Sequence, residues 1–532
     1  MDLANRMCGI STATTAAAAG RAMPASRWLR PAIACALGLM LVLVQGRASA
    51  AVFSVIETDD GGPGSLRQAI IDANAAGGSN TIAFAIPGSG PHVITLASAL
   101  PIVTGTLTID GYSQPGSAPN SHSPEQGGLD AQLMIELVGS GSYGFAIQGS
   151  QTSLTVQGLA MHGFGDAIVG NNGGSDASHL ALYGNYIGTQ VDGSALPSLG
   201  NSGSAVLCGF SSAQIGGTQP WQRNLLSGNG GAGVLTNGPV VIEGNLVGTD
   251  AGGTLPIPNG TANNWGGIIV GSRTGVRIGG ADVAMRNVIS GNRPLGIGLW
   301  AGFGPGGPIG SFEIKGNYIG TDWSGQRPLP NGFEQPNAAQ FGGGIQLQGG
   351  DGSALPIGGF ADGEANLIAF NTGAGIIAGT NSASEAFDSR ANLVHHNRGV
   401  GRANIDIGAP GPTPNDVDDV DAGSNAVQNA PEIVTASQQG NELTLTYRVD
   451  STTTASAYPL RIDIHADVAG GAGAWLTEDS YPEQSAQQPR TITLLVPAGV
   501  SAIPFVATAT DAAGRTSEAS PAFDVIFEDG LE

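Results

Sequence analysis

The sequence has little charge, few aromatic side chains and almost no cysteine. Of its 532 residues, 12% are charged, 5% are aromatic and three are cysteines, whereas 41% are hydrophobic. A disordered polyelectrolyte would have many charges and few apolar residues, so that class is excluded. Glycine occupies 86 positions without a three-residue period, which excludes collagen and disfavours long helices. What remains is a β protein with glycine at its turns.

Basic residues are also scarce, which excludes partners that are bound through clustered cations. Without residues 1–50 the chain has 15 basic and 41 acidic side chains, and Lys315 is its only lysine. We therefore expect no nucleic-acid partner, because nucleic acids are bound through lysine and arginine patches. Cys8 and Cys35 lie in the first fifty residues. If that segment is removed, Cys208 has no partner for an intramolecular disulfide.

The first fifty residues have the pattern of an export signal. Three arginines between residues 21 and 30 precede thirteen apolar residues at 32–44, and Ala48-Ser49-Ala50 forms an A-x-A cleavage site. The apolar run is too short to span a bilayer comfortably, and no later run reaches about 18 apolar residues. We predict a signal peptide at 1–50 and an exported protein that is extracellular, on the cell surface or periplasmic. After signal removal we expect no membrane-spanning segment.

Two short elements recur along the middle of the chain. The first, Gly-Asn-x-x-Gly-Thr, occupies 184–189, 244–249 and 316–321, and the second, Asn-x-x-x-x-Asn, occupies 224–229, 287–292, 366–371 and, more loosely, 392–397. Each copy reads as a strand of three to five residues with glycine or asparagine at its ends. Such strands suit a solenoid, in which each strand pairs with its equivalent one coil later.

The repeat predicts the fold class. The chain is expected to be all-β, with a right-handed parallel β-helix at 80–412. Apolar side chains of successive coils should stack inside it. Asparagine tolerates the left-handed conformation of tight corners, and its amide can pair with the asparagine stacked above it.

An N-terminal cap is expected at 51–79, because an open coil exposes apolar core and unpaired strand edges. A strand at 52–57 precedes a helix that begins after Gly64, and Ser65 with Gln68 fits an S-x-x-Q capping box. The face predicted to cover the first coil consists of Leu66, Ala69, Ile70 and Ala73.

The same residues carry a resemblance to a known group of proteins. The segment Gly64–Ile70, the following Asp72-Ala73-Asn74 and the stretch Thr108–Gly116 are similar to the CSLREA-type N-terminal region of bacterial exported β-helix repeat proteins. This chain has Gly64 and Gln68 where that motif has cysteine and glutamate. The resemblance implies the pectin lyase-like β-helix architecture. It implies no activity, because proteins of this kind are largely without an assigned one.

A different pattern begins near residue 429. Glycine thins out, and period-two stretches appear at 443–447, 460–464, 490–496 and 505–510. Such alternation predicts a small immunoglobulin-like β-sandwich with a short tail at 429–532. Between it and the β-helix lies an acidic linker at 413–428.

The linker is the best candidate for a metal site. Asp416, Asp418, Asp419, Asp421 and Asn425 fall within ten positions, with Gly423 between them. Closely spaced oxygen ligands with a nearby glycine suit a hard cation such as calcium. The motif lacks the terminal glutamate and flanking helices of an EF-hand. The alternative is a solvated linker whose charges repel one another.

Several residue groups raise the possibility of catalysis. Asp250 and Asp322 follow Gly-Thr in equivalent copies. They could form a column of carboxylates along a groove, or they could be turn residues, which their repetition favours. The arginines at 273, 277, 286 and 293 could serve a polysaccharide lyase or could pair with local acids. His395 and His396 are adjacent on a predicted strand, so they should point to opposite faces and not share a metal.

Two functions remain open from the sequence. The first is an exported, non-catalytic protein that binds glycans or mediates adhesion, which repetition without a unique polar constellation favours. The alternative is a polysaccharide lyase or glycoside hydrolase acting on an acidic polysaccharide. Exposed tryptophans lining one groove would favour sugar binding, and Trp265, Trp300 and Trp323 are the candidates.

Overall fold

The computed structural model of the protein describes residues 50–149, 151–170, 178–198, 200–207, 209–262, 264–272, 274–300, 311–333, 342–349, 352–379, 385–397, 403–496, 504–524 and 526–527. Residues 1–49, which contain nearly all of the predicted export signal, lie outside the described residues, as do Cys208 and Arg273.

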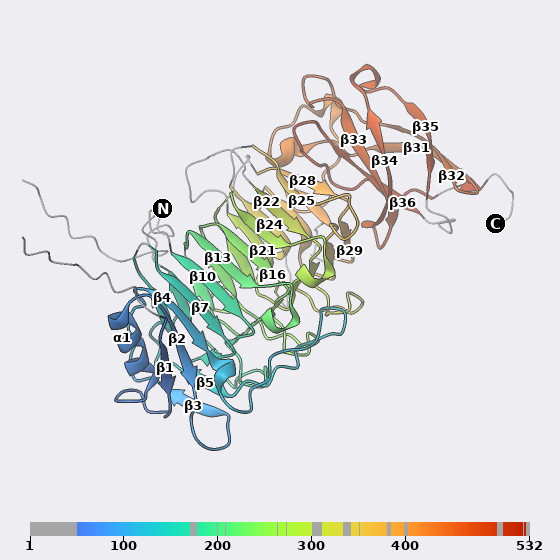
Figure 1. The fold of residues 1–532 in the computed structure, drawn as a ribbon. Coiled ribbons are helices and arrows are strands. Elements are labelled where there is room, and N and C mark those ends of the chain that lie inside the picture. The colour runs from blue at the N-terminus through green and yellow to red at the C-terminus, as the bar shows by residue number, and fades with distance from the viewer. Residues whose placement is uncertain are drawn as a thin grey trace, which may run out of the picture. The chain divides into compact units, whose positions relative to one another are not determined.

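Most of the chain forms the predicted right-handed parallel β-helix (Figure 1), whose coils build three long parallel sheets. Sheet A contains β1 (Val52–Val55), β2 (Ser79–Phe84), β4 (Thr106–Asp110), β7 (Ser153–Gln157), β10 (His179–Tyr183), β13 (Ser212–Gly216), β16 (Val240–Glu243), β19 (Val276–Gly279) and β22 (Phe312–Lys315). Further along the chain, the two strands β25 (Leu355–Gly358) and β28 (Phe387–Arg390) pair separately.

The other two sheets use the remaining strands of each coil. Sheet B contains β3 (His92–Thr95), β5 (Ile135–Val138), β8 (Ala160–His162), β11 (Tyr186–Ile187), β14 (Leu225–Leu226), β17 (Leu246–Val247), β20 (Val288–Ile289), β23 (Tyr318–Ile319), β26 (Leu367–Ala369) and β29 (Leu393–His395). Sheet C contains β6 (Phe145–Ile147), β9 (Ile168–Gly170), β12 (Val206–Leu207), β15 (Val234–Thr236), β18 (Ile268–Val270), β21 (Leu295–Trp300), β24 (Gly343–Gln348), β27 (Ala374–Ala378) and β30 (Ile405–Ile407).

The side chains of sheet A alternate between core and surface. In β7, Leu154 and Val156 are buried, whereas Thr155 between them is only partly covered. The register carries each column from coil to coil, so that Val156 stacks between Ile109 and Leu182. This stacking of apolar side chains, one above another along the helix axis, forms the core of the solenoid.

Two asparagine ladders run through the corners on either side of sheet B, as the repeats predict. In each ladder the side-chain Nδ2 of one asparagine donates to the Oδ1 of the next, at 2.8–3.2 Å. The first ladder contains Asn185, Asn224, Asn245, Asn287, Asn317, Asn366 and Asn392, and the second contains Asn201, Asn229, Asn259, Asn292, Asn331, Asn371, Asn397 and Asn404.

A second, smaller apolar cluster lies on the outer face of sheet B. The first residue of each short strand points outward, and Tyr186, Leu225 and Leu246 are nevertheless fully buried. They are covered by side chains from the loop that precedes β5, including Leu129. Buried Arg223 holds this loop by donating to the carbonyl oxygens of His122 and Gly127. The sequence repeat therefore has two apolar faces.

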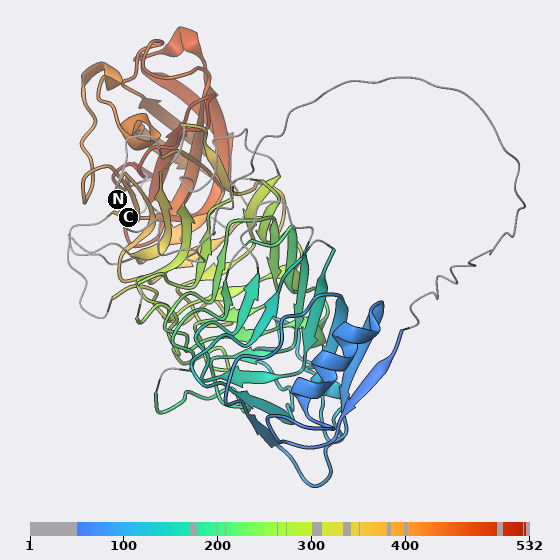
Figure 2. The same cartoon turned by 90° about the vertical axis from the view of Figure 1, so that its left-hand side faces the viewer.

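The helix α1 (Leu66–Ala76) lies beside β1 and β2 at the N-terminal end of the stack, as Figure 2 shows. Its buried residues are those predicted from the sequence. The Ser65 hydroxyl accepts from the Gln68 N–H at 3.2 Å, but the Gln68 side chain donates to Asp72 instead of returning to Ser65. Only half of the predicted capping box is formed.

The C-terminal strands form the two sheets of the predicted immunoglobulin-like sandwich. One sheet has the order β35 (Arg490–Leu495), β32 (Glu442–Arg448), β31 (Glu432–Gln439), β37 (Ile526–Phe527). The other has the order β34 (Ala472–Tyr481), β33 (Leu460–Asp467), β36 (Phe505–Thr510), and all its pairings are antiparallel. A shared core includes Tyr447, Leu445, Ile462 and Phe505.

The last coils of the β-helix contact the sandwich directly. Val394 of β29 pairs antiparallel with Ala472 of β34, which joins sheet B to the sandwich. Arg461 of β33 forms ion pairs with Asp388 of β28 at 3.0 Å and with Asp463 at 2.7 Å. Among the described residues, no helix has the length and apolar character needed to cross a membrane.

Candidate functional site

The predicted metal ligands lie in a folded segment that packs against its surroundings. It contains two short 3₁₀ turns, η4 (Val417–Asp419) and η5 (Ser424–Val427). Asp419 and Asn425 are buried. The alternative of a solvated linker therefore does not hold for these two residues, whereas Asp421 is exposed.

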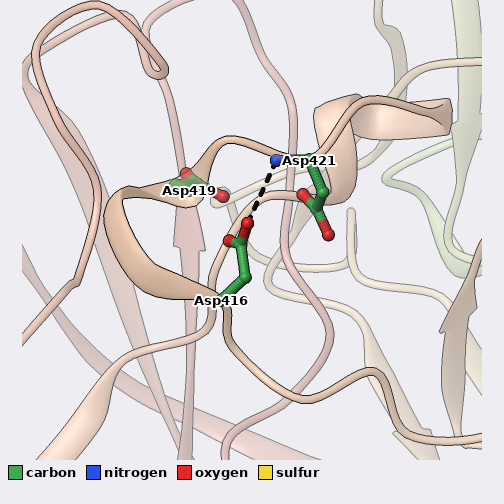
Figure 3. A group of neighbouring side chains, drawn as sticks. All are labelled: Asp416, Asp419 and Asp421. Carbon is green, nitrogen blue, oxygen red and sulfur yellow. Dashed lines mark hydrogen bonds between the residues drawn. The ribbon is translucent and has the colours of Figure 1, made fainter.

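Three of the five predicted ligands converge. Asp416, Asp419 and Asp421 each offer a carboxylate oxygen within 4.8 Å of the others, and Figure 3 shows Asp416 and Asp421 facing one another across the turn. The turn is tight because Asp418 and Asp419 both have positive φ angles, of 67° and 59°. Two successive left-handed residues reverse the chain and bring Asp416 back toward Asp421.

The hydrogen bonds at this cluster leave oxygen atoms available. Asp416 Oδ2 accepts from the backbone N–H of Val420 and of Asp421, each at 3.1 Å. The other oxygen, Oδ1, is buried and has no hydrogen-bond partner in the part of the chain that the structure describes. Both oxygens of Asp419 accept hydrogen bonds, Oδ1 from the Asn429 N–H at 3.1 Å and Oδ2 from Gln428 Nε2 at 2.9 Å and Ser456 Oγ at 3.0 Å.

The three carboxylates disfavour one another's charge. Burial raises the pKa of Asp421, and the charges of Asp416 and Asp419 raise it further. Burial also raises the pKa of Asp419, against hydrogen bonds from its serine neighbours that lower it. A bound cation would relieve this repulsion, and oxygen-only ligands suit calcium.

Asp418 and Asn425 are turned away from the cluster and connect the segment to other elements. Asp418 Oδ1 accepts from the Gln487 side chain in the sandwich. Asn425 Oδ1 accepts from the Phe387 N–H at 2.8 Å, and its Nδ2 donates to the Thr516 carbonyl. These two residues hold the segment between the last coils and the sandwich.

A different group of side chains lies on the outer face of sheet A. Trp221, in η2 (Pro220–Gln222), is 37% exposed, and its ring meets that of Tyr183 edge-on, with centroids 5.4 Å apart. Tyr183 lies at the end of β10, where its side chain is partly covered. The pKa of Tyr183 is raised, first by burial and then by the charge of Glu243.

Polar side chains continue from this aromatic pair along the same face. Gln157 donates to Asp110 at 2.9 Å on one side of Tyr183. On the other side Gln214 donates to Glu243 at 3.0 Å, and Arg277 donates to the same carboxylate at 2.6 Å. We call Trp221, Tyr183 and these five polar residues the sheet A surface. It presents an aromatic ring beside planar hydrogen-bonding groups.

Of the three tryptophans considered from the sequence, Trp265 is partly covered in the loop that precedes β18. Trp300 is buried in β21. Trp323 packs against the outer cluster of sheet B, and Gly127 and Gly253 lie against its ring. Trp221, which the sequence analysis did not single out, is 37% exposed, and its only sequence signal is its place in a polar turn after a strand.

The carboxylates of Asp250 and Asp322 serve turns, as their repetition suggested. Asp250 Oδ1 accepts from the backbone N–H of Thr254 and Leu255, each at 2.8 Å. Asp322 Oδ1 accepts from the equivalent N–H groups of Gln326 and Arg327.

Two of the three described arginines of the proposed lyase group, Arg277 and Arg286, have separate roles. Arg277 is paired with Glu243 at 2.6 Å on the surface of sheet A. Arg286 lies over the ring of Tyr318, with its guanidinium carbon 4.1 Å from the ring centroid. A guanidinium held on an aromatic face and one held by a carboxylate do not form a common basic site.

The expectation that His395 and His396 point apart is wrong. Their Nδ1 atoms lie 2.9 Å from each other. His396 follows the end of β29 with a φ of 55°, so the alternation of a strand no longer applies to it. The left-handed corner turns its imidazole back toward that of His395.

Comparison with known proteins identifies no family for the chain. No protein-family model matches the chain, and no curated protein matches it. The function is therefore argued from the described residues.

Proposed function

We propose that the protein is exported and binds glycans through the sheet A surface, as a non-catalytic binding or adhesion protein outside the cell. The single observation that carries this proposal is the exposed Trp221 ring, packed edge-on against Tyr183 beside a row of amide, carboxylate and guanidinium groups. The sequence pattern of residues 1–50 supports export.

The chemistry of sugars suits this surface. A pyranose ring has an apolar face of C–H groups that packs on an aromatic ring, and its hydroxyl groups exchange hydrogen bonds with planar polar side chains. Trp221 offers the ring, and Gln157 and Gln214 offer amides on either side of Tyr183. Because these side chains are already oriented by hydrogen bonds within the row, little ordering accompanies binding.

The spacing of the carboxylates supports binding rather than glycoside hydrolysis. Asp110 and Glu243 belong to the same outward column of sheet A, four strands apart in the order β4, β7, β10, β13, β16. At about 4.8 Å per strand this separation is about 19 Å. Hydrolysis needs two carboxyl groups about 5 to 9.5 Å apart.

The charge of the chain favours neutral glycans over acidic ones. The excess of acidic side chains repels polyanions from a distance. Arg277 is already neutralised by Glu243. We therefore assign neutral polysaccharides to the site, with a lyase or hydrolase of acidic polysaccharides as the competing function.

A combined binding and depolymerisation screen tests the proposal. The purified protein is incubated with neutral glucans, pectin, alginate, hyaluronan and chondroitin, with calcium or with chelator. Retention on neutral glucans without new reducing ends or unsaturated uronates supports binding. Calcium-dependent product from an acidic polymer would overturn the proposal and support the lyase.

We also propose that Asp416, Asp419 and Asp421 bind calcium. The support is the convergence of three carboxylates, together with the buried, unpartnered Oδ1 of Asp416. Asp418 and Asn425, whose side chains bond elsewhere, are not required for this smaller site. The cation would fix the segment that lies between the β-helix and the sandwich.

A further inference from the structure

The corners after the last two strands of sheet B have large side chains where equivalent corners have glycine. The corner after β14 has Gly228 and the corner after β20 has Gly291, with φ angles of 77° and 76°. After β26 and β29 the same positions are Phe370 and His396, with φ angles of 62° and 55°. Left-handed backbone is costly for side chains of this size.

The side chains at these two corners form one cluster with His395. The ring of Phe370 lies 5.1 Å from that of His396, measured between centroids, and 6.3 Å from that of His395. The two imidazoles meet at an interplanar angle of 78°. Both histidines are partly exposed, so solvent reaches the pair.

The separation of the two imidazoles matches a metal chelate. Bonds of about 2.05 Å from a metal to two nitrogens at a right angle place those nitrogens about 2.9 Å apart, whereas a tetrahedral angle requires about 3.3 Å. The observed Nδ1–Nδ1 distance is 2.9 Å. Right angles between imidazole ligands are typical of tetragonal copper(II), which also binds nitrogen ligands most tightly among the divalent metals of the first row.

We propose that His395 and His396 form a bidentate copper(II) site at the C-terminal end of sheet B. Without metal, one Nδ1–H donates to the other Nδ1. With metal, both rings have their hydrogen on Nε2 and both Nδ1 atoms bind the ion, with water in the remaining positions.

The two histidine rings are held in position in the absence of an ion. The two Nδ1 atoms already lie at chelating distance, and the rings meet at 78°. Phe370 supports the His396 ring from one side, so the chelate is oriented before the ion arrives.

Copper titration of the purified protein at pH 7 tests the site. We expect one ion per chain by calorimetry and two strongly coupled nitrogens in the copper EPR spectrum. His396→Gly is the decisive variant, because glycine occupies the equivalent corner at Gly228 and Gly291 and relieves the left-handed strain. It should fold at least as well as the parent protein and lose copper affinity by about tenfold or more.

Two controls separate this site from other sources of binding. His179→Gln removes an exposed histidine of sheet A and should leave the copper affinity unchanged. Asp421→Asn tests whether the acidic cluster takes the ion. Copper binding that persists in folded His396→Gly, or an EPR spectrum without two coupled nitrogens, would overturn the proposal, as would equal losses in His179→Gln.

Discussion

Arg461 of the sandwich strand β33 donates to Asp388 of the β-helix strand β28 at 3.0 Å. The same guanidinium pairs with Asp463 at 2.7 Å, and both carboxylates are buried. Burial raises the pKa of Asp463, and the charge of Arg461 opposes that shift. Asp388 also pairs with Arg390 at 2.7 Å, so two cations and two buried acids form a small network at this contact.

Replacing Arg461 should loosen the contact between the β-helix and the sandwich. In Arg461→Met, buried Asp463 loses its ion-pair partner and buried Asp388 keeps only Arg390, and we expect a loss of about 3 kcal/mol of stability. The measurement is chemical unfolding monitored by tryptophan fluorescence. Arg448→Met is the matched control, because its pair with Glu432 is exposed at the surface. An equal effect of both substitutions would contradict the role of Arg461.

Replacing a single interior asparagine of the ladder should destabilise the protein. Asn287 donates to Asn317 Oδ1 at 2.9 Å and to the Ile242 carbonyl at 2.8 Å, and it accepts from the Asn245 backbone and side chain. Asn287→Ala leaves these buried groups unpaired, and we expect destabilisation of about 3 kcal/mol or more.

The matched control for the ladder is Gln326→Ala, which truncates an exposed side chain in a nearby turn. Its unfolding midpoint should stay close to that of the parent protein. If Asn287→Ala unfolds at the same denaturant concentration as Gln326→Ala, the ladder does not stabilise the solenoid as described.

Stability should fall as the pH rises from about 5 to 8 because of Glu518. Burial raises the pKa of this carboxyl from 4.5 to about 7, against hydrogen bonds from the N–H groups of Ile407 and Thr413. The folded state therefore binds a proton that the unfolded state has released. This contribution, on the order of 3 kcal/mol, is complete below pH 4.5 and is lost as the pH rises through 7.

Glu518→Gln checks the assignment, since glutamine is isosteric and does not titrate. The midpoint of thermal unfolding should decline between pH 5 and pH 8 in the parent protein and change much less in the variant. The same decline in both proteins would assign the pH dependence to other groups.

Calcium should stabilise the protein through the acidic cluster. A ligand present at about 100 times its dissociation constant adds about 2.7 kcal/mol to stability. Asp421→Asn removes one carboxylate from the cluster and should abolish most of the calcium-induced rise in melting temperature. Asp59→Asn, at an exposed aspartate of the N-terminal cap, should retain it. No calcium heat at millimolar concentration would refute the site.

The sequence predicted those features that arise from repetition. The recurrence of Asn224, Asn287 and Asn366 at the same place in successive copies of one element is enough to infer stacked corners, because a solenoid places equivalent residues above one another. The alternating strands of the sandwich were predictable for a similar reason. At these positions the local sequence pattern and the three-dimensional fold indicate the same structure.

Features that depend on distant contacts or on unusual backbone were not predictable. The sequence pattern predicts Tyr186 as a core residue. It is buried, but outside the coil and under the loop that precedes β5. Arg223, about a hundred residues further along the chain, holds that loop. The meeting of His395 and His396 requires a left-handed histidine, which no local pattern indicates. Trp221 is exposed in the 3₁₀ turn η2, and its neighbours in the sequence do not indicate this exposure.

The most direct test of the account compares glycan binding by Trp221→Ala and Tyr143→Ala. Tyr143 is a matched control because it is also an exposed aromatic residue of the β-helix, at 38% against 37% for Trp221. On immobilised neutral glucans, Trp221→Ala should lose affinity by about tenfold or more, equivalent to at least 1.4 kcal/mol, while Tyr143→Ala binds like the parent protein. Undiminished binding by folded Trp221→Ala would contradict the sheet A surface as the glycan site.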